Sequence, residues 1–162
     1  MSFIDLDPKY RIHAVGDTAS RESAIKYFNS QGWFHDNFGF QLDGGSFVGK
    51  PNNFYQYSPL MQRSPDLYVR ENYKDWFLVE LKGTGASNYV NVFTPKLDAY
   101  VKWNDLHPMK FFINKSDTKQ IAYLGHDEFM STLDGLSVKH TKNMMESYYS
   151  IPCNRFIWMN AF

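Results

Sequence analysis

The chain has 162 residues, which suffice for one hydrophobic core and are too few for two domains of ordinary size. Its 17 Lys and Arg residues balance 17 Asp and Glu residues, so a polycation of the chromatin-coating kind is excluded, although a local basic groove is not. Hydrophobic residues make up 43% and aromatic residues 18% of the chain, yet no run reaches the roughly eighteen apolar residues of a membrane span.

Cysteine content and the N-terminal residues indicate the cellular compartment. Cys153 is the single cysteine of the chain, so an intramolecular disulfide is excluded and a reducing environment is favoured. The segment from Met1 to Asp7 carries acidic residues where a secretory signal would have positive charge and then a long apolar run. We therefore expect a cytoplasmic protein.

The first predicted element is a helix. Asp17 and Thr18 provide its start, residues 19 to about 31 continue it, and Gly32 ends it. Its apolar side is formed by Ala24, Ile25 and Phe28. The next segment, residues 39 to 62, is the least regular part of the chain, and Gly44-Gly45 fits the tip of a hairpin between residues 40–42 and 46–48.

A second hairpin follows. Residues 66–70 and 75–82 alternate like two strands, and the polar connector 71–74 predicts the turn between them. If the loop has an odd length and is centred on Tyr73, Asp66 lies opposite Glu80, whereas an even loop would send one carboxylate to the other face. Alternation also places Leu78, Glu80 and Lys82 on one face of the second strand, with Phe77, Val79 and Leu81 on the other.

The two carboxylates and the lysine of this hairpin are the strongest candidates for chemistry. Directly opposed Cβ atoms lie roughly 4.5–5.5 Å apart, which allows Asp66 and Glu80 to hold one cation beside Lys82. The alternative is that Asp66 is a turn residue after proline and that Glu80 and Lys82 form a solvent-facing ion pair. Glu80 ends a strongly apolar run, where an unpaired charge would be costly to bury, so the catalytic interpretation is favoured.

The remaining elements are predicted from glycine, proline and capping residues and from apolar runs. Residues 83–87 form a flexible strand exit, and Thr94-Pro95 opens a helix as a capping residue followed by proline. Residues 109–114 and 121–124 read as buried strands, and a short helix begins at 127–130. The aromatic-rich tail from residue 139 to 162 has more apolar bulk than a free tail should carry, so we expect it to complete the core and to form an oligomer interface.

The hairpin motif resembles the signature of the PD-(D/E)XK nuclease superfamily. It stands here as Pro65-Asp66, a gap of thirteen residues, and Glu80-Leu81-Lys82. The α-β-β-β-α-β order of the superfamily core matches residues of about 16 to 135. The resemblance implies an α/β (α+β) nuclease fold with a mixed central sheet flanked by helices. Chain length indicates one domain over residues 1–162, in which residues 136–162 form a C-terminal extension outside the resemblance. The resemblance also places the first core strand within residues 39–62.

The resemblance further implies a metal-dependent DNA endonuclease that hydrolyses phosphodiester bonds. Asp66, Glu80 and the backbone carbonyl of Leu81 would bind Mg²⁺, with Mn²⁺ as a substitute, because these hard oxygen ligands disfavour zinc. Lys82 would orient or deprotonate the attacking water. A helix glutamate completes the metal site in relatives of the junction-resolvase type, and Glu22 matches it; the alternative is an exposed Glu22 paired with Lys26 one turn later.

Candidate contacts with nucleic acid lie on either side of the motif. Relatives of the RecB type carry Gln-x-x-x-Tyr on the helix after the catalytic strands, and Lys96 and Tyr100 stand at the matching positions. Arg63 and Lys102 are further candidates for a basic groove. The partner implied is DNA, bound by a homodimer whose two sites face two strands.

Three alternatives stay open from the sequence. The fold could serve as a non-catalytic nucleic-acid-binding module, as an RNA-directed nuclease in which His35 joins the site, or as a structural protein that binds partners through its aromatic tail. The sequence does not separate a junction resolvase, a restriction-type or homing endonuclease, and an exonuclease. No Walker-type loop, dinucleotide fingerprint or nucleophile elbow is present, and the five histidines lack a zinc-binding spacing.

Overall fold

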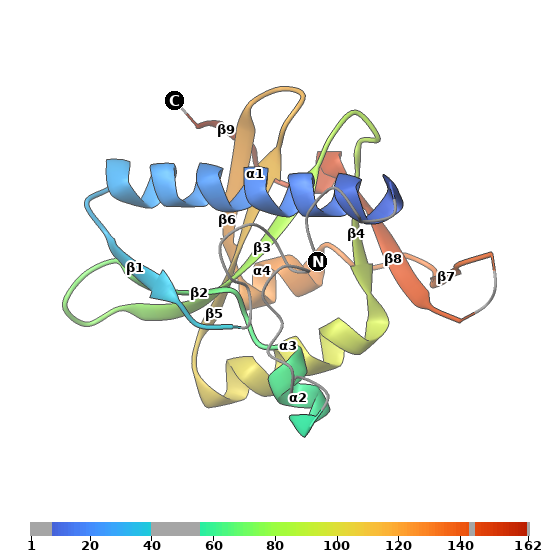
Figure 1. Ribbon diagram of the computed structural model, residues 1–162, viewed down its shortest axis with the longest axis horizontal. Helices are drawn as coiled ribbons and strands as arrows, with labels where there is room; N and C mark the ends of the chain where they lie inside the picture. Colours follow the sequence, from blue (N-terminus) through green and yellow to red (C-terminus); the bar gives the residue numbers. More distant parts are fainter. Residues whose placement is uncertain (1–7, 40–55, 143–144, 162) are drawn as a thin grey trace.

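The computed structural model describes residues 8–39, 56–142 and 145–161, with side chains placed from residue 19 onward. This part of the chain forms a mixed α+β fold in which a six-stranded sheet carries helices on both faces (Figure 1). In spatial order the sheet comprises β1 (Phe34–Asn37), β2 (Leu67–Arg70), β3 (Trp76–Thr84), β5 (Met109–Lys115), β6 (Gln120–Gly125) and β9 (Met159–Asn160). A second sheet has the order β4 (Tyr89–Phe93), β8 (Ser147–Pro152) and β7 (Lys139–His140). The helices are α1 (Pro8–Ser30), α2 (Pro59–Gln62), α3 (Thr94–Leu106), α4 (His126–Ser131) and the 3-10 turn η3 (Cys153–Arg155).

The predicted fold class is confirmed, and so is the element order. Helix α1, strands β1 to β3, helix α3 and strand β5 follow one another in the α-β-β-β-α-β sequence, with α2 and β4 inserted. Strands β1, β2 and β3 pair antiparallel, and β5 returns parallel to β3 through the α3 crossover. This parallel pairing is the connection that brings α3 over the centre of β3.

The register of the β2–β3 hairpin is the one predicted from an odd loop. Leu67 pairs with Val79 and Arg70 with Trp76, so the hairpin is centred on Tyr73. Continued by one residue, the same register sets Asp66 opposite Glu80. The faces also follow the alternation: Val79 packs in the cluster beneath α1, whereas Leu78 packs in the cluster beneath α3.

Helix α1 covers one face of the larger sheet. Ala24 and Phe28 are fully buried against Val79, Phe112 and Ile121. The helix is longer than predicted, since it begins at Pro8, but it ends at Ser30 as expected. Gly32 follows with φ of +73°, a left-handed conformation in which a residue without a Cβ terminates the helix at least cost.

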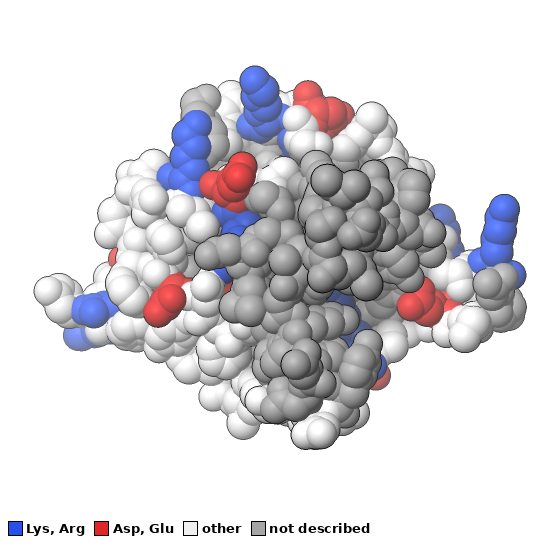
Figure 2. Space-filling view, in the orientation of Figure 1, with Lys and Arg blue, Asp and Glu red and all other residues white. Residues whose placement is uncertain are grey.

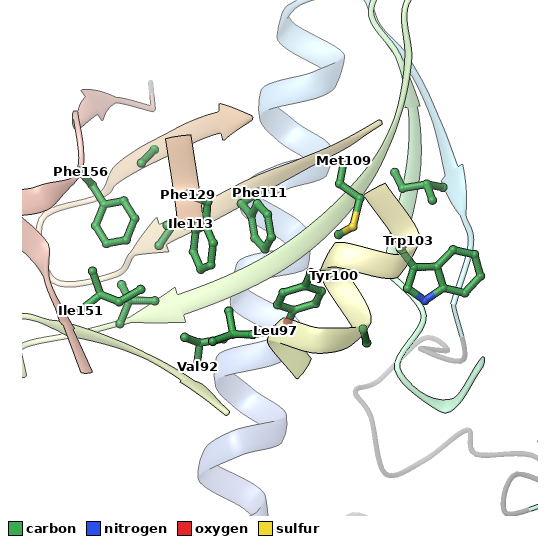
Figure 3. Close-up of a cluster of buried hydrophobic side chains, with 14 of the residues drawn as sticks. Val92, Leu97, Tyr100, Trp103, Met109, Phe111, Ile113, Phe129, Ile151 and Phe156 are labelled. Atoms are coloured by element: carbon green, nitrogen blue, oxygen red, sulfur yellow. The ribbon is translucent and has the colours of Figure 1, made fainter. Parts of the chain in front are cut away.

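The opposite face is covered by α3, α4 and the smaller sheet (Figure 3). Tyr100 from α3, Phe111 from β5 and Phe129 from α4 are buried in one cluster. The C-terminal segment belongs to this cluster through Ile151 and Phe156, because β8 pairs with β4. It also reaches the larger sheet, where β9 pairs with the edge of β6.

Phe111 is expected to be one of the most stabilising side chains of this cluster. It is fully buried, and its ring stacks on Phe129 with centroids 3.9 Å apart. Phe111→Ala leaves a cavity and should lower the free energy of unfolding by about 3–5 kcal/mol, measured by urea unfolding. Leu106→Ala, at an exposed position of α3, should change it by less than about 0.5 kcal/mol and serves as the control. A loss below about 1 kcal/mol for Phe111→Ala would contradict the packing.

One sequence expectation about element starts was wrong, and another lies largely outside the described residues. The first strand that the structure describes is Phe34–Asn37, ahead of the segment 39–62 in which the resemblance placed the first core strand. Residues 40–55 of that segment, with the hairpin expected at 40–48, lie outside the described residues. Helix α3 does open at Thr94, but Phe93 holds the N-cap position and Thr94 is already inside the first turn. The Thr94 hydroxyl instead shares a hydrogen bond with Ser147 of β8.

In the ranges that the structure describes, no helix combines the length and apolar character needed to cross a bilayer.

Candidate active site

Asp66 is held at the point where β2 begins. Its backbone N–H donates to the carbonyl of Val79 at 3.1 Å, and its Oδ2 accepts the backbone N–H of Leu81 at 2.7 Å. Both the backbone and the side chain of Asp66 are therefore hydrogen-bonded to β3, and the residue is only 4% exposed. The preceding residue, Pro65, is buried as well, so the chain enters β2 in one fixed direction.

Glu80 lies in the middle of β3 and receives three side chains on one oxygen. Its Oε1 accepts a hydrogen bond from the Tyr100 hydroxyl at 2.7 Å and another from Lys82 Nζ at 3.2 Å. Lys96 Nζ lies 3.6 Å from the same oxygen. Glu80 is 4% exposed, so this carboxylate is buried with its compensating charges beside it.

Regular secondary structure explains why these groups meet. Glu80 and Lys82 are two residues apart on β3 and therefore project from the same face. Lys96 and Tyr100 are four residues apart on α3, which places them one above the other on the helix side facing β3. Because the chain crosses from β3 through α3 to β5, the side chains of Lys96 and Tyr100 on α3 meet Glu80 on β3.

Burial and mutual repulsion divide the two carboxylates into different protonation states. Burial, followed by the negative charge of Glu80, raises the pKa of Asp66 to about 8. Burial acts on Glu80 in the same direction, but the ammonium groups of Lys82 and Lys96 and the Tyr100 hydrogen bond outweigh it, so the pKa of Glu80 is lowered. At neutral pH the site therefore holds an ionised Glu80 and a protonated Asp66.

The lysine and the tyrosine of the site are also perturbed. Burial and then the neighbouring charge of Lys96 lower the pKa of Lys82, although both carboxylates act against this shift. Burial and the adjacent Glu80 raise the pKa of Tyr100, so its hydroxyl remains a donor. A lysine with a depressed pKa exchanges protons more readily than an ordinary surface lysine, which is the property a general acid or base requires.

The donor set fits a small divalent cation. Asp66 and Glu80 offer hard carboxyl oxygens, and a bound cation would offset the cost of ionising Asp66 beside Glu80. The carbonyl of Leu81 points to the same side of β3 as its N–H, which faces Asp66. Across the described ranges, no group of three or more His, Cys, Asp or Glu side chains gathers as a metal site. The candidate site therefore has two side-chain ligands and a backbone carbonyl.

The structure does not bring Glu22 to this point. Ser20 and Ala24 are the buried positions of α1 in this stretch, and Glu22 between them is exposed on the outer side of the helix. Helix α1 packs on the face of Val79, opposite to the face that carries Glu80. His35 also lies on the α1 side, where its Nε2 hydrogen-bonds with Asn29 Oδ1 at 2.9 Å. The structure therefore does not bring Glu22 or His35 together with Asp66 and Glu80.

The candidate nucleic-acid contacts divide in the structure. Lys96 stands at the site, and its side chain is 42% exposed. Lys102 is exposed on α3, and Arg63 follows α2, where its Nη1 donates to the carbonyl of Pro59 at 3.5 Å. Tyr100 is only 1% exposed and donates its hydroxyl to Glu80, so in this structure it positions that carboxylate.

Sequence reasoning missed two parts of the site, namely the Tyr100–Glu80 hydrogen bond and the Leu81 N–H to Asp66 bond. The lysine–tyrosine spacing on α3 was a signal for the first, because i and i+4 residues share a helix face. No side-chain pattern announces the second, since any residue at position 81 would supply the same backbone donor.

Tyr100→Phe is expected to weaken both the fold and the site. Losing a hydrogen bond to a buried carboxylate should lower the free energy of unfolding by about 1.5–3 kcal/mol. It should also raise the pKa of Glu80, which moves the acid limb of any pH–rate profile to higher pH. Tyr123→Phe is the matched control, because Tyr123 donates to Glu71 at 2.8 Å on the other face of the sheet. That variant should lose stability and keep its activity; an unchanged unfolding midpoint for Tyr100→Phe would contradict the bond.

Comparisons with known proteins were made at the level of family models, sequences and solved structures. No family model matches the chain, and no curated protein matches its sequence. A solved structure described as a nuclease from a fusselovirus is similar, with a TM-score of 0.49 and 10% sequence identity. The match covers 93% of this chain and 88% of that chain.

Proposed function

We propose that the protein is a metal-dependent nuclease that hydrolyses phosphodiester bonds in DNA. The observation that carries the proposal is the buried pair of Asp66 and Glu80, with Lys82 hydrogen-bonded to Glu80 at 3.2 Å. Two adjacent buried carboxylates have no structural purpose that a hydrophobic pair would not serve better, whereas they suit cation binding. The order of these residues in the hairpin supports the resemblance to PD-(D/E)XK nucleases.

The carboxylates and one carbonyl would hold the cation, with Mg²⁺ or Mn²⁺ preferred. Asp66 and Glu80 supply side-chain oxygens, and Leu81 supplies its backbone carbonyl beside them. When bound, the ion would polarise the scissile phosphate and lower the pKa of an attacking water. Ion binding must displace the proton of Asp66, so affinity should increase as the pH rises toward its pKa of about 8.

Lys82 is the residue to which we assign proton exchange with the attacking water. It is bound to Glu80 and buried in the site, its side chain being 12% exposed, and its pKa is lowered. Such an ammonium group orients a water molecule, and its depressed pKa permits it to exchange a proton with that water. Lys96, more exposed and also next to Glu80, is placed to offset charge that builds on the phosphate in the transition state.

The test is a cleavage assay on purified protein. Supercoiled plasmid, linear duplex, single-stranded DNA, a four-way junction and a structured RNA would each be incubated with Mg²⁺, Mn²⁺ or chelator. Glu80→Gln is the matched variant, because it keeps the size of the side chain and removes the charge. We expect metal-dependent cutting of DNA that Glu80→Gln loses. Cutting that persists in chelator or in Glu80→Gln would place the chemistry elsewhere.

A non-catalytic nucleic-acid-binding module is the second candidate function. It is favoured by the two lysines that already neutralise Glu80, since this arrangement is electrically satisfied without a cation. The same assay separates the two functions. Binding to nucleic acid with no cleavage under any metal, by protein whose folding is verified, would favour the module. A cytoplasmic location and a homodimer that presents two sites belong to the nuclease proposal, and sedimentation analysis tests the dimer.

A further inference from the structure

A group of aromatic rings around one arginine lies at the free end of the β2–β3 hairpin. We call it the hairpin platform, and it consists of Phe34, Tyr68, Arg70, Tyr73 and Trp76. Tyr68 and Trp76 stack with ring centroids 4.6 Å apart, and Phe34 meets the Trp76 ring edge-on at 6.1 Å. The guanidinium carbon of Arg70 lies 4.3 Å from the centre of the Tyr73 ring and 5.0 Å from that of Trp76.

The platform is on the same face of the sheet as the candidate active site. Trp76 and Glu80 are separated by four residues of β3, an even number, so their side chains project the same way. Arg70 pairs directly with Trp76 and Phe34 pairs with Arg70, which puts both on this face as well. From Asp66 to Arg70 the strand covers four residues, or about 13 Å. This distance equals about four stacked nucleotides at roughly 3.4 Å each.

Two rings of the platform are open to solvent, whereas Tyr68, Arg70 and Trp76 are half-buried. Tyr73 is 90% exposed and Phe34 is 55% exposed. Large aromatic rings that project into water from a hairpin tip add nothing to the core, and a contiguous exposed apolar group marks a binding surface. The guanidinium group of Arg70 contacts both the Tyr73 and the Trp76 rings, and its Nε donates to the carbonyl of Asn72 at 3.3 Å. Its Nη groups remain candidates for an anion.

The charge distribution of the protein gives little long-range attraction for a nucleic acid. The chain has no net charge, and Figure 2 shows acidic and basic side chains interspersed over the described surface in that view. Bulk attraction to phosphates is therefore weak, and affinity has to come from local contacts. Base–aromatic stacking is such a contact, worth about 1–3 kcal/mol per base and tolerant of sequence.

We propose that the hairpin platform binds unpaired nucleobases of a single-stranded segment of the substrate. The bases stack on the exposed rings of Tyr73 and Phe34, and Arg70 holds a phosphate between them. Duplex DNA cannot use the platform, because the faces of its bases are already stacked on each other. The strand then runs along β2 toward Asp66, so the scissile phosphate lies a few nucleotides from the stacked bases.

This inference rests on the proposed nuclease function, but its test is a binding measurement that needs no cleavage. Fluorescein-labelled dT20, rU20 and a 20-base-pair duplex would be titrated with the full chain in chelator, with anisotropy as the readout. Tyr73→Ala removes an exposed ring, and Arg70→Lys keeps the charge while removing the planar group. Tyr89→Ala is the matched control, because Tyr89 is an exposed tyrosine of the other sheet with Lys139 over its ring at 5.6 Å.

Tyr73→Ala should raise the Kd for dT20 about fivefold or more, with a similar change for Arg70→Lys, while Tyr89→Ala binds like the parent. Duplex binding should be weaker and unaffected by all three. Equal Kd values for rU20 and dT20 would show that the platform recognises bases and phosphates and not the sugar. A lower Kd for one of them would identify DNA or RNA as the preferred strand.

Four results would overturn the inference: no binding of single strands by the parent, an unchanged Kd in Tyr73→Ala, equal losses on duplex and single strand, or a loss in Tyr73→Ala that matches Tyr89→Ala. A sedimentation experiment that shows a dimer dissolved by Tyr73→Ala, with single-strand affinity retained, would assign the platform to a second copy of the chain. If the protein cleaves DNA but its binding does not depend on the platform, the nuclease proposal stands and the platform proposal fails. If binding depends on the platform but no cleavage occurs, the platform proposal stands and the nuclease proposal fails.

Discussion

Lys82→Met should reduce metal-dependent cleavage by about a hundredfold to ten-thousandfold, the range that a positioned proton-transfer or charge-stabilising group supplies. Methionine keeps the unbranched stem that packs along β3, so only the ammonium group is removed. Glu80 retains Tyr100 at 2.7 Å and Lys96 at 3.6 Å, which keeps its charge compensated and the local fold intact. The loss should appear in kcat, measured by single-turnover cleavage, because the group acts on the reacting water and not on remote substrate contacts.

Lys110→Met is the control for the removal of a partly buried lysine. Lys110 pairs with Glu71 at 2.6 Å and lies over Phe77 at 4.0 Å, both on the α1 face of the sheet. This variant should lose stability and cleave at the parental rate. Lys82→Met cleaving within about threefold of the parent, at equal folding, would remove Lys82 from the mechanism.

Asp66→Asn should make the protein more stable at neutral and alkaline pH. Folded Asp66 has a pKa of about 8 against an ordinary value of 3.8, so above pH 4 the folded protein retains a proton that the unfolded chain releases. The free energy of unfolding therefore falls as the pH rises from about 4 to about 8. Asparagine carries no such charge, and its side-chain oxygen can still accept the Leu81 N–H. We expect about 1–2 kcal/mol of added stability at pH 8, a Tm increase of about 3–6 °C.

The pH dependence distinguishes this effect from an ordinary packing improvement. In chelator, the difference in Tm between Asp66→Asn and the parent should become small below about pH 3, where Asp66 is mostly neutral in both folded and unfolded chains. At pH 8, added Mg²⁺ should raise the Tm of the parent and leave that of Asp66→Asn unchanged, since only the folded parent binds the ion. Asp98→Asn, at an exposed position of α3, should show neither effect. A parent protein that is more stable than Asp66→Asn at pH 8 in chelator would contradict the raised pKa.

Local periodicity determined how much of the site was predictable. The centre at Tyr73, the opposition of Asp66 and Glu80 and the two faces of β3 all follow from a two-residue repeat and a loop of odd length. Lys96 and Tyr100 follow from a helix repeat that begins at a recognisable Thr-Pro start. These features depend on residues no more than fourteen positions apart, where chain geometry constrains the outcome most.

Features that depend on distant parts of the chain were not predictable. The strand Phe34–Asn37 contains histidine, aspartate and asparagine, and it forms because β2 offers a free edge and not because of its own propensity. Pairing of β9 with β6 joins residues about forty positions apart and leaves no periodic signature. The outward position of Glu22 was settled by which face of α1 packs on the sheet, a choice made by Ala24 and Phe28 against β3 and β5.

The hydrogen bond from Leu81 to Asp66 makes one backbone amide an internal reporter of the whole site. The backbone nitrogen of Leu81 lies 2.7 Å from Oδ2 of Asp66, an oxygen of the carboxyl group that gains or loses charge. The amide resonance of Leu81 in a ¹H–¹⁵N spectrum should therefore move with the ionisation of Asp66 and again when a cation binds. A single assigned peak, followed through a pH series and a magnesium series, would record proton release and ion capture in the undisturbed native chain.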